Sequence, residues 1–391
     1  MPAQRVTLPV RFGLPNFEVK LPDSAFFSKL AIATVVKIDS KRQQIYVGDG
    51  MANRLYSLDR QLTILEKVST PGPVVDINLQ AGSAVATIIG KDFNANNLKN
   101  GMLAKADLSP MGIKGLAKYN NFGSLGRPLK ALSADFNKDG LPDQLIAEFG
   151  NMLGRLTWRE NMGKGVYQTH VLRDFPGAID LKIDDYDHDG LPDIWALFAQ
   201  ADEAIYLYAN IGDGKFTEKR IMSFPPSYGS SSFQRIDFNR DGLTDILYTC
   251  GDNADLSKIL KPYHGIYLYL NEGGNKFKLR YFHPINGCYK AIAKDLDLDG
   301  DLDIAAISAF PAAITPWEAF VYLQNNGNYS FQPFALPKDI PFQKGLTMDV
   351  GDVDGDGKPE LLLGNKFYTS SSGSYREPLL VLLKNRNAAR K

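Results

Sequence analysis

The chain of 391 residues carries 44 basic and 44 acidic side chains, so its formal net charge at pH 7 is zero. This balance argues against a nucleic-acid-binding protein, which presents a strongly basic surface. The sequence has no apolar run of the roughly 18 to 20 residues that a transmembrane helix needs, and its first residues lack the apolar core of a signal peptide.

The first predicted element is a β-strand at residues 16–22, Asn-Phe-Glu-Val-Lys-Leu-Pro. Near the other end of the chain, the strand-like run 379–385 stops at a turn residue, with six residues after it. The N-terminal strand can therefore supply the partner that the last predicted strand lacks, which would leave no open sheet edge. The alternative is that residues 1–28 form a loose arm.

Residues 29–72 and 73–125 each contain four short runs with strand character. In the first region these runs are 30–38, 44–47, 54–58 and 62–65. A short basic segment that begins at Asp39 follows the first run. We predict two β-sheet repeats that lack a metal-binding loop.

The rest of the chain contains five acidic loops, whose first residues are separated by 50, 52, 58 and 57 positions. Each loop has an oxygen-bearing side chain at its first, third, fifth and ninth positions and Gly at its sixth. Such side chains can converge on one point, and Ca²⁺ prefers a shell of oxygen ligands. The predicted ligands are Asp135, Asn137, Asp139 and Asp143; Asp185, Asp187, Asp189 and Asp193; Asp237, Asn239, Asp241 and Asp245; Asp295, Asp297, Asp299 and Asp303; and Asp352, Asp354, Asp356 and Glu360.

A second motif recurs with the loops. Asn-x-Gly, followed after three residues by an aromatic residue, begins at Asn161, Asn210, Asn271 and Asn325. Asn and Gly favour the left-handed backbone of a hairpin turn, and the aromatic residue begins the next strand. Repeats of this length indicate propeller blades or solenoid units. Each repeat is predicted as strand, acidic loop, strand, variable loop, strand, hairpin turn and strand.

The acidic loops and hairpin turns resemble the FG-GAP/VCBS repeat of integrin-type β-propellers. The resemblance implies an all-β fold in which each blade carries a calcium loop between its first and second strands. With the two metal-free repeats added, we predict one domain, residues 1–391, folded as a seven-bladed β-propeller of four-stranded antiparallel blades. The predicted blades are 29–72, 73–125, 126–172, 173–225, 226–284, 285–338 and 339–391, the last completed by the strand at 16–22.

The resemblance also implies up to five structural calcium ions and a location outside the cytoplasm, where calcium is abundant. We expect a periplasmic, cell-surface or secreted protein, and we favour a monomer. Asn137 and Asn239 replace Asp in two loops, so a neutral oxygen would coordinate with weaker charge attraction. In the last loop, the longer Glu360 takes the ninth position.

On the face opposite the calcium loops, long connections between second and third strands carry aromatic and cationic residues. We predict a binding or adhesion module for a glycan or an extracellular protein, because aromatic rings suit stacking on sugars. The alternative is that these aromatic residues pack the loops against one another. The candidate contact residues are Trp158, Tyr263, His264, Lys290, Trp317 and Tyr368.

An enzyme is the second hypothesis, because some propellers that resemble this one are polysaccharide lyases or sugar dehydratases. Such a reaction needs a base beside a sugar C–H bond and a cation that holds the sugar carboxylate. Tyr263 and His264 are the candidate bases, and Lys290 and Arg155 are the candidate cations. The sequence has no nucleophile elbow, phosphate-binding loop or zinc-ligand spacing.

One residue in each acidic repeat lies five positions before the first loop Asp. These residues are expected to line the mouth of the propeller channel, where they would either bind an anion or ordered water, or simply be solvated. They are Lys130, Asp180, Ser232, Lys290 and Thr347.

Cys250 and Cys288 are the two cysteines of the chain. They are expected on the same face of adjacent blades. A disulfide between them is one alternative, and two unpaired core thiols are the other.

Overall fold

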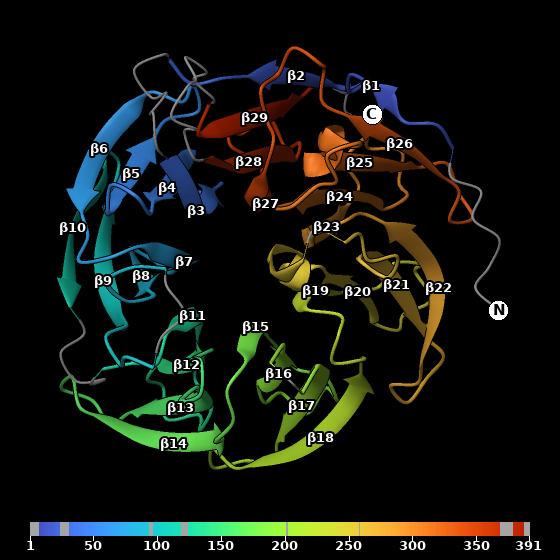
Figure 1. Ribbon diagram of the computed structural model, residues 1–391. Helices are drawn as coiled ribbons and strands as arrows, with labels where there is room; N and C mark the ends of the chain where they lie inside the picture. Colours follow the sequence, from blue (N-terminus) through green and yellow to red (C-terminus); the bar gives the residue numbers. More distant parts are fainter. Residues whose placement is uncertain are drawn as a thin grey trace.

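The structure is a computed structural model that describes residues 8–23, 31–93, 97–118, 124–200, 202–257, 259–367 and 378–386. Its strands form sheets arranged in a closed ring around a central axis (Figure 1). Apart from two short 3-10 helices, η2 (Asp252–Leu256) and η3 (Pro316–Ala319), the regular elements of the described residues are β-strands. The predicted all-β propeller is therefore confirmed.

Five blades each contain four antiparallel strands, which follow chain order from the axis outward (Figure 1). The blades are β7 (Val74–Leu79), β8 (Ser83–Ile88), β9 (Met102–Ser109) and β10 (Gly112–Lys118); β11 (Pro128–Ala134), β12 (Asp143–Glu148), β13 (Arg155–Asn161) and β14 (Tyr167–Arg173); β15 (Ala178–Asp184), β16 (Asp193–Phe198), β17 (Ala204–Asn210) and β18 (Phe216–Ser223); β19 (Ser230–Ile236), β20 (Asp245–Cys250), β21 (Gly265–Asn271) and β22 (Phe277–Pro284); and β23 (Cys288–Lys294), β24 (Asp303–Ser308), β25 (Phe320–Asn325) and β26 (Phe331–Ala335).

The remaining sheet has eight strands and is a composite. Strand β28 pairs with β3 within it, and β27 also pairs with β28. The prediction of seven separate four-stranded blades is therefore wrong. The reason is the length of β28, which extends past its partner β27 so that Lys366 pairs with Ile32 of β3. The strands of the composite sheet are β2 (Phe17–Lys20), β3 (Ala31–Asp39), β4 (Gln44–Asp49), β5 (Arg54–Leu58), β6 (Ile64–Ser69), β27 (Gly345–Gly351), β28 (Glu360–Phe367) and β29 (Leu380–Asn385).

The N-terminal segment lies along two outer edges of the ring (Figure 1). Strand β2 runs antiparallel to β29, with Phe17 opposite Asn385. The short strand β1 (Arg11–Phe12) runs parallel to β26. The Phe17 ring also meets the ring of Tyr322 edge-on, with 5.8 Å between their centroids. The segment thus covers edges that would otherwise offer unpaired backbone groups to another chain.

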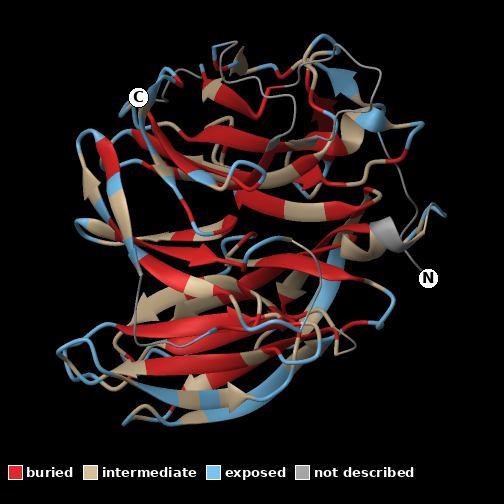
Figure 2. Ribbon diagram, turned by 60° about the vertical axis from the view of Figure 1, so that its left-hand side comes forward, coloured by how far each residue is buried: buried red, intermediate tan, exposed pale blue. Residues whose placement is uncertain are grey.

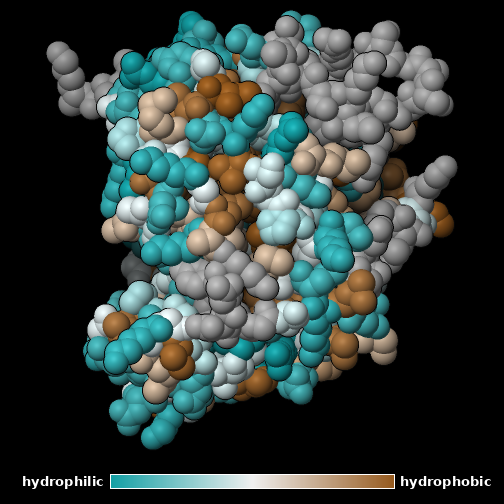
Figure 3. All heavy atoms as spheres, turned by 90° about the vertical axis from the view of Figure 1, so that its left-hand side faces the viewer, coloured by the Kyte–Doolittle hydropathy of each residue, from teal (hydrophilic) through white to brown (hydrophobic). Residues whose placement is uncertain are grey.

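The core lies in layers between neighbouring sheets. All six residues of β12 and of β16 are buried, while the outer strands β14 and β18 have no buried residue and several exposed ones. Figure 2 shows the same contrast between buried inner strands and partly exposed outer ones. A second strand is packed on both faces by its neighbours, so even its polar residues, such as Gln144 and Glu148 of β12, are buried. On the side of the ring that holds β6 and β10, hydrophobic residues gather in the upper middle of the face, with hydrophilic residues around them (Figure 3).

Candidate functional site

The five acidic loops occupy equivalent places, each between the innermost and second strands of its repeat. In the fourth loop, Gly300 has a φ of 104°, a backbone region that favours glycine. Its N–H donates to Asp295 Oδ2 at 3.1 Å, and the Asp301 N–H donates to Asp299 Oδ1 at 2.8 Å. The same two contacts recur in the other four loops. The backbone itself therefore orients the first and fifth carboxylates.

Three of the loops bring carboxylate oxygens within 4.8 Å of one another. One oxygen each of Asp185, Asp295 and Glu360 is buried and has no hydrogen-bond partner among the described residues. A buried oxygen without a partner costs free energy, and a cation would satisfy it. Because these donors are hard oxygens, the residues present fit Ca²⁺. The three clusters are Asp185, Asp187 and Asp193; Asp295, Asp297 and Asp299; and Asp352, Asp354 and Asp356.

Two carboxyl groups at the ninth position have strongly perturbed pKa values. Burial raises the pKa of Asp303 to about 7, and the neighbouring Asp297 carboxylate adds to this effect. Burial likewise raises the pKa of Glu360 to about 7, with Asp354 and Asp356 contributing. A cation among these groups would relieve the repulsion that disfavours their charged forms.

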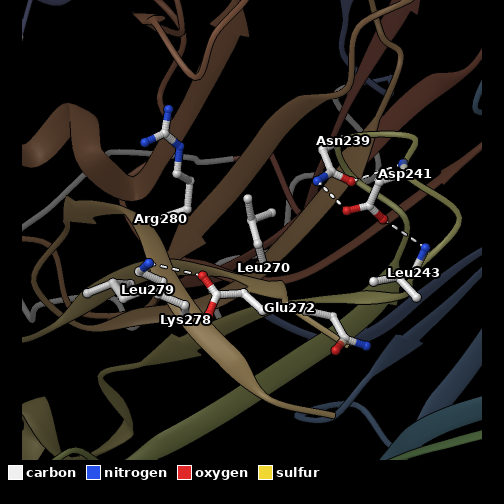
Figure 4. Close-up of a pocket in the computed structure, with 9 residues that line it drawn as sticks. Asn239, Asp241, Leu243, Leu270, Glu272, Lys278, Leu279 and Arg280 are labelled. Carbon is white, nitrogen blue, oxygen red and sulfur yellow. Dashed lines mark hydrogen bonds and ion pairs between the residues drawn. The ribbon is translucent and has the colours of Figure 1, made fainter. Parts of the chain in front are cut away.

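The first and third loops differ, because their third residue is an amide. Asn239 Nδ2 donates to Asp241 Oδ2 at 2.8 Å (Figure 4), and Asn137 Nδ2 donates to Asp139 Oδ2 at 3.2 Å. This contact satisfies one carboxylate oxygen without a cation. The loops thus form two classes, and the two amide-containing loops are the weaker candidates for Ca²⁺. A hollow of about 550 Å³ lies beside the third loop, and its charged Lys278 and Glu272 pair with each other at 3.0 Å (Figure 4).

The ninth residue also joins its loop to the hairpin turn, a role that the sequence did not suggest. Asp245 is fully buried; its Oδ1 accepts the Asn271 N–H at 2.8 Å, and its Oδ2 accepts the Phe238 N–H at 2.9 Å. Asp143, Asp193 and Asp303 make the equivalent pair of contacts. The signal that could have revealed this contact is the pairing of a ninth-position acid with a hairpin Asn in successive repeats.

A central cavity of about 830 Å³ lies along the innermost strands. Its lining includes Lys130, Asp180, Ser232, Lys290 and Thr347, as their common spacing predicted. Each of these residues directly follows an irregularity in strand pairing, and these irregularities occur at the same point of each strand. The cavity also contacts connections on the face opposite the acidic loops, through Phe93, Phe149 and Asp252.

Two of the predicted ligand-face residues are occupied by packing. Trp158 is only 2% exposed and stacks on His170 at 4.3 Å between centroids, so it belongs to the core and not to the ligand face. Trp317 is half-buried and meets Phe12 edge-on at 5.7 Å. Tyr368 lies outside the described residues.

The candidate bases of the enzyme hypothesis are also engaged. His264 is 1% exposed; its Nε2 contacts Asn253 Oδ1 at 2.8 Å, and its Nδ1 accepts the Gly287 N–H at 3.3 Å. Burial lowers the pKa of His264 to about 4, so it is a neutral structural side chain at pH 7. The Tyr263 ring stacks on Tyr228 at 5.0 Å.

The two candidate cations lie in different environments. Arg155 Nε forms an ion pair with the fully buried Glu148 at 3.2 Å, whereas Lys290 lines the central cavity. Tyr263, His264 and Arg155 do not line that cavity. Within the described part of the chain, the four candidates therefore do not form one site.

Cys250 and Cys288 are both buried and free, so no disulfide joins them in this structure. The Cys250 thiol donates to the Tyr263 carbonyl at 3.3 Å. Burial raises the pKa of both thiols, which keeps them protonated at neutral pH.

Comparison with known families supports the sequence interpretation. Residues 185–248 and 295–363 match the family model of the FG-GAP-like repeat. The chain carries FG-GAP-like repeats. The matched stretches contain four of the five acidic loops, so the resemblance predicted from these motifs is confirmed.

Solved structures with similar folds are distant in sequence. Sqt1 of Saccharomyces cerevisiae matches with a TM-score of 0.58 and 7% identity, over 96% of this chain and 100% of that chain. The WD40 β-propeller domain of Doa1 matches with a TM-score of 0.54 and 11% identity, over 94% of this chain and 96% of that chain. A chain in the S. cerevisiae complex of Dbp5 with Nup159, Gle1, IP6 and ADP matches with a TM-score of 0.53 and 11% identity, over 96% of this chain and 97% of that chain. These likenesses show the propeller fold alone.

No curated protein sequence matches the FG-GAP-repeat chain. In the parts of the chain that the structure describes, no helix is long and apolar enough to cross a membrane.

Substitutions of Asp245 test the contact between loop and hairpin. In the presence of EGTA, Asp245→Ala should lower the free energy of unfolding by about 2–4 kcal/mol, because two buried N–H groups lose their acceptor. Asp245→Asn keeps one acceptor oxygen and should cost roughly half as much. Urea denaturation measures both, with Asp213→Asn as the control, since the Asp213 side chain is 89% exposed and Asn tolerates its left-handed backbone. A cost for Asp245→Ala no larger than that of the control would contradict the contact.

Proposed function

We propose that this FG-GAP-repeat propeller is a calcium-stabilised binding module that acts outside the cytoplasm and recognises a protein through the face opposite its acidic loops. The repeat family and the propeller fold support a binding module. The observation that carries the choice of face is the distribution of exposed hydrophobic side chains over the connections between second and third strands.

Those connections expose large hydrophobic residues in five repeats. The exposed fraction reaches 78% at Ile259, 76% at Ile314 and 72% at Met152. Single exposed hydrophobic residues are ordinary, and the hairpin side of the ring also exposes Met111, Met162, Val166 and Ile211. The three most exposed large hydrophobic residues of the described chain, however, all lie on the connections between second and third strands, and this favours that face as the interaction surface. The residues are Met51, Leu98, Met152, Leu153, Ile259, Leu260 and Ile314.

Two of these connections are directly linked. The Met152 N–H donates to Asn97 Oδ1 at 2.9 Å, which places the connection that carries Leu98 beside the one that carries Met152 and Leu153. Gln200 Nε2 donates to the Asn151 carbonyl at 2.5 Å and continues the linkage to the next repeat. Neighbouring connections thus form a joint surface instead of independent loops.

The chemistry of this surface favours a protein over a glycan. Methionine and aliphatic side chains suit protein interfaces, whereas sugar sites use open aromatic faces. The aromatic candidates Trp158, Tyr263 and Trp317 already pack against other rings. No grouping of the candidate catalytic residues supports the enzyme alternative, since only Lys290 lines the central cavity.

Calcium removal tests the metal part of the proposal. A ligand at 100 times its Kd stabilises a fold by about 2.7 kcal/mol per site, so EGTA should lower Tm by on the order of 10 °C if several loops are filled. Asp187→Ala should remove more of the calcium-dependent rise in Tm than Asn137→Ala, because Asp187 brings a charge to the same loop position. Differential scanning fluorimetry with and without Ca²⁺ measures this. Equal Tm values in EGTA and in Ca²⁺ would refute the calcium sites.

Photo-crosslinking tests the binding face with two exposed methionines. A photoreactive residue in place of Met152, which is 72% exposed, should give a discrete crosslinked protein in the source cells. The matched control replaces Met162, which is 53% exposed on the hairpin side of the same blade. Mass spectrometry should identify a partner from position 152 alone. The same crosslinked species from both positions, or from position 162 alone, would contradict the assigned face.

A further inference from the structure

The central cavity carries a group of lysines that the proposed protein-binding face does not use. The charged side chains that line it from the innermost strands are four lysines and three aspartates. The lysines are Lys37, Lys130, Lys182 and Lys290, and the aspartates are Asp76, Asp180 and Asp349. Arg127, Lys366 and Asp252 also line the cavity.

Strand geometry brings these groups together. Residues two positions apart on a strand point to the same side, so Asp180 and Lys182 of β15 both face the cavity, and both line it. Lys130 of β11 reaches the same carboxylate from the neighbouring strand, with 2.6 Å between its Nζ and Asp180 Oδ1. Lysines from different strands thus meet at a shared aspartate.

The aspartates are already committed to other contacts. Asp180 accepts from Lys130 and from Lys182 Nζ, at 2.6 and 2.7 Å, and also from the N–H groups of Leu181 and Phe233. One carboxylate therefore balances two ammonium groups. Asp349 Oδ2 accepts the Ile38 N–H at 2.9 Å and lies 3.4 Å from Lys37 Nζ.

Lys290 has no carboxylate within 4.0 Å among the described residues; its Nζ donates to the Met348 carbonyl at 2.7 Å. An ammonium group offers three donors, so Lys290 keeps donors for a further acceptor. Burial lowers the pKa of Lys290, and burial lowers that of Lys182 to about 7, with repulsion from Lys130 adding to it. Both shifts show that burial disfavours the charged lysines more than the nearby aspartates stabilise them.

We propose that the central cavity binds an oxyanion between Lys182 and Lys290, with Lys130 and Lys37 adding positive charge. A sulfate, phosphate or carboxylate would accept the remaining lysine donors and offset the repulsion among the ammonium groups. The volume of about 830 Å³ exceeds that of one inorganic anion. The anion is therefore either free or the charged group of a larger acidic sugar, and both share the same chemistry. This site is independent of the proposed protein-binding face.

Titration calorimetry of the calcium-loaded full chain tests the site at constant ionic strength. The probes are sodium sulfate, which keeps its charge throughout the neutral range, and glucuronate, a monomeric acidic sugar. Saturable binding of either probe is expected, and the tighter one identifies a free anion or a sugar carboxylate as the source. Lys182→Met and Lys290→Met should each weaken binding by about tenfold or more, since each removes a charged hydrogen bond.

The control is Lys278→Met on the outer strand β22, whose side chain is 74% exposed and should leave the affinity unchanged. Because Lys290 also contacts a backbone carbonyl, the melting curve of each variant is recorded without anion. A second measurement needs no variant: sulfate should protect Lys182 and Lys290 from acylation, read by mass spectrometry, and leave Lys278 reactive. No saturable binding of either probe, or equal weakening by Lys278→Met, would overturn the proposal, as would unprotected cavity lysines.

Discussion

The ring of sheets depends on polar side chains that reach across the central channel wall from one innermost strand to the next. An innermost strand is the edge of its sheet. The row of N–H and C=O groups that faces the channel therefore lacks strand partners. In this propeller, side chains from the neighbouring strand supply several of those partners. The contacts are Asp76 to the Ala131 N–H, Asp180 to the Phe233 N–H, Gln234 to the Ala293 N–H, Asp349 to the Ile38 N–H, Lys290 to the Met348 carbonyl and Thr34 to the Val74 carbonyl.

This constraint explains why the channel carries charged and polar side chains among apolar ones although it lies at the centre of a large fold. Buried polar groups are tolerated when they are hydrogen-bonded, and here they fasten neighbouring sheets. The same requirement engages the channel aspartates in hydrogen bonds to backbone N–H groups. The lysines of the innermost strands therefore outnumber the carboxylates that can pair with them. The proposed oxyanion site is therefore a consequence of how the ring closes, because the groups that hold the strands together set the charge of the cavity.

The acidic loops, in contrast to the channel, carry an excess of carboxylates. Four of the five loops are fastened to a hairpin by a buried ninth residue, as Asp245 shows. The hairpin residue Asn210 in turn reaches a neighbouring repeat, since its Nδ2 donates to the Phe136 carbonyl at 2.8 Å. Asn385, the last residue of β29, makes a similar contact, because its Nδ2 donates to the Leu296 carbonyl at 2.8 Å. The loops thus connect strands within a repeat and repeats to each other. A metal there would stabilise the ring, and the connections on the other face remain available for a partner.

Local, repeated features were predictable from the sequence, whereas the packing between repeats was not. The fivefold loop pattern and the Asn-x-Gly turns gave the all-β propeller, and a common spacing placed Lys130 and Lys290 in the channel. The count of separate blades failed because two extra residues of β28 pair with β3, which no motif records. Trp158 and His264 were misplaced because their burial depends on layers formed by distant segments.

Hydrogen exchange with and without Ca²⁺ tests most directly whether the acidic loops are structural and separate from the binding face. The account predicts that calcium slows exchange at the loop glycine amides, such as Gly190, Gly300 and Gly357, which donate to the first loop Asp. Exchange at the Met152 amide, in a connection on the other face, should stay unchanged. Slowing at Met152 as large as that at the loop glycines would contradict the account, because it would couple the metal loops to the face proposed for partner binding.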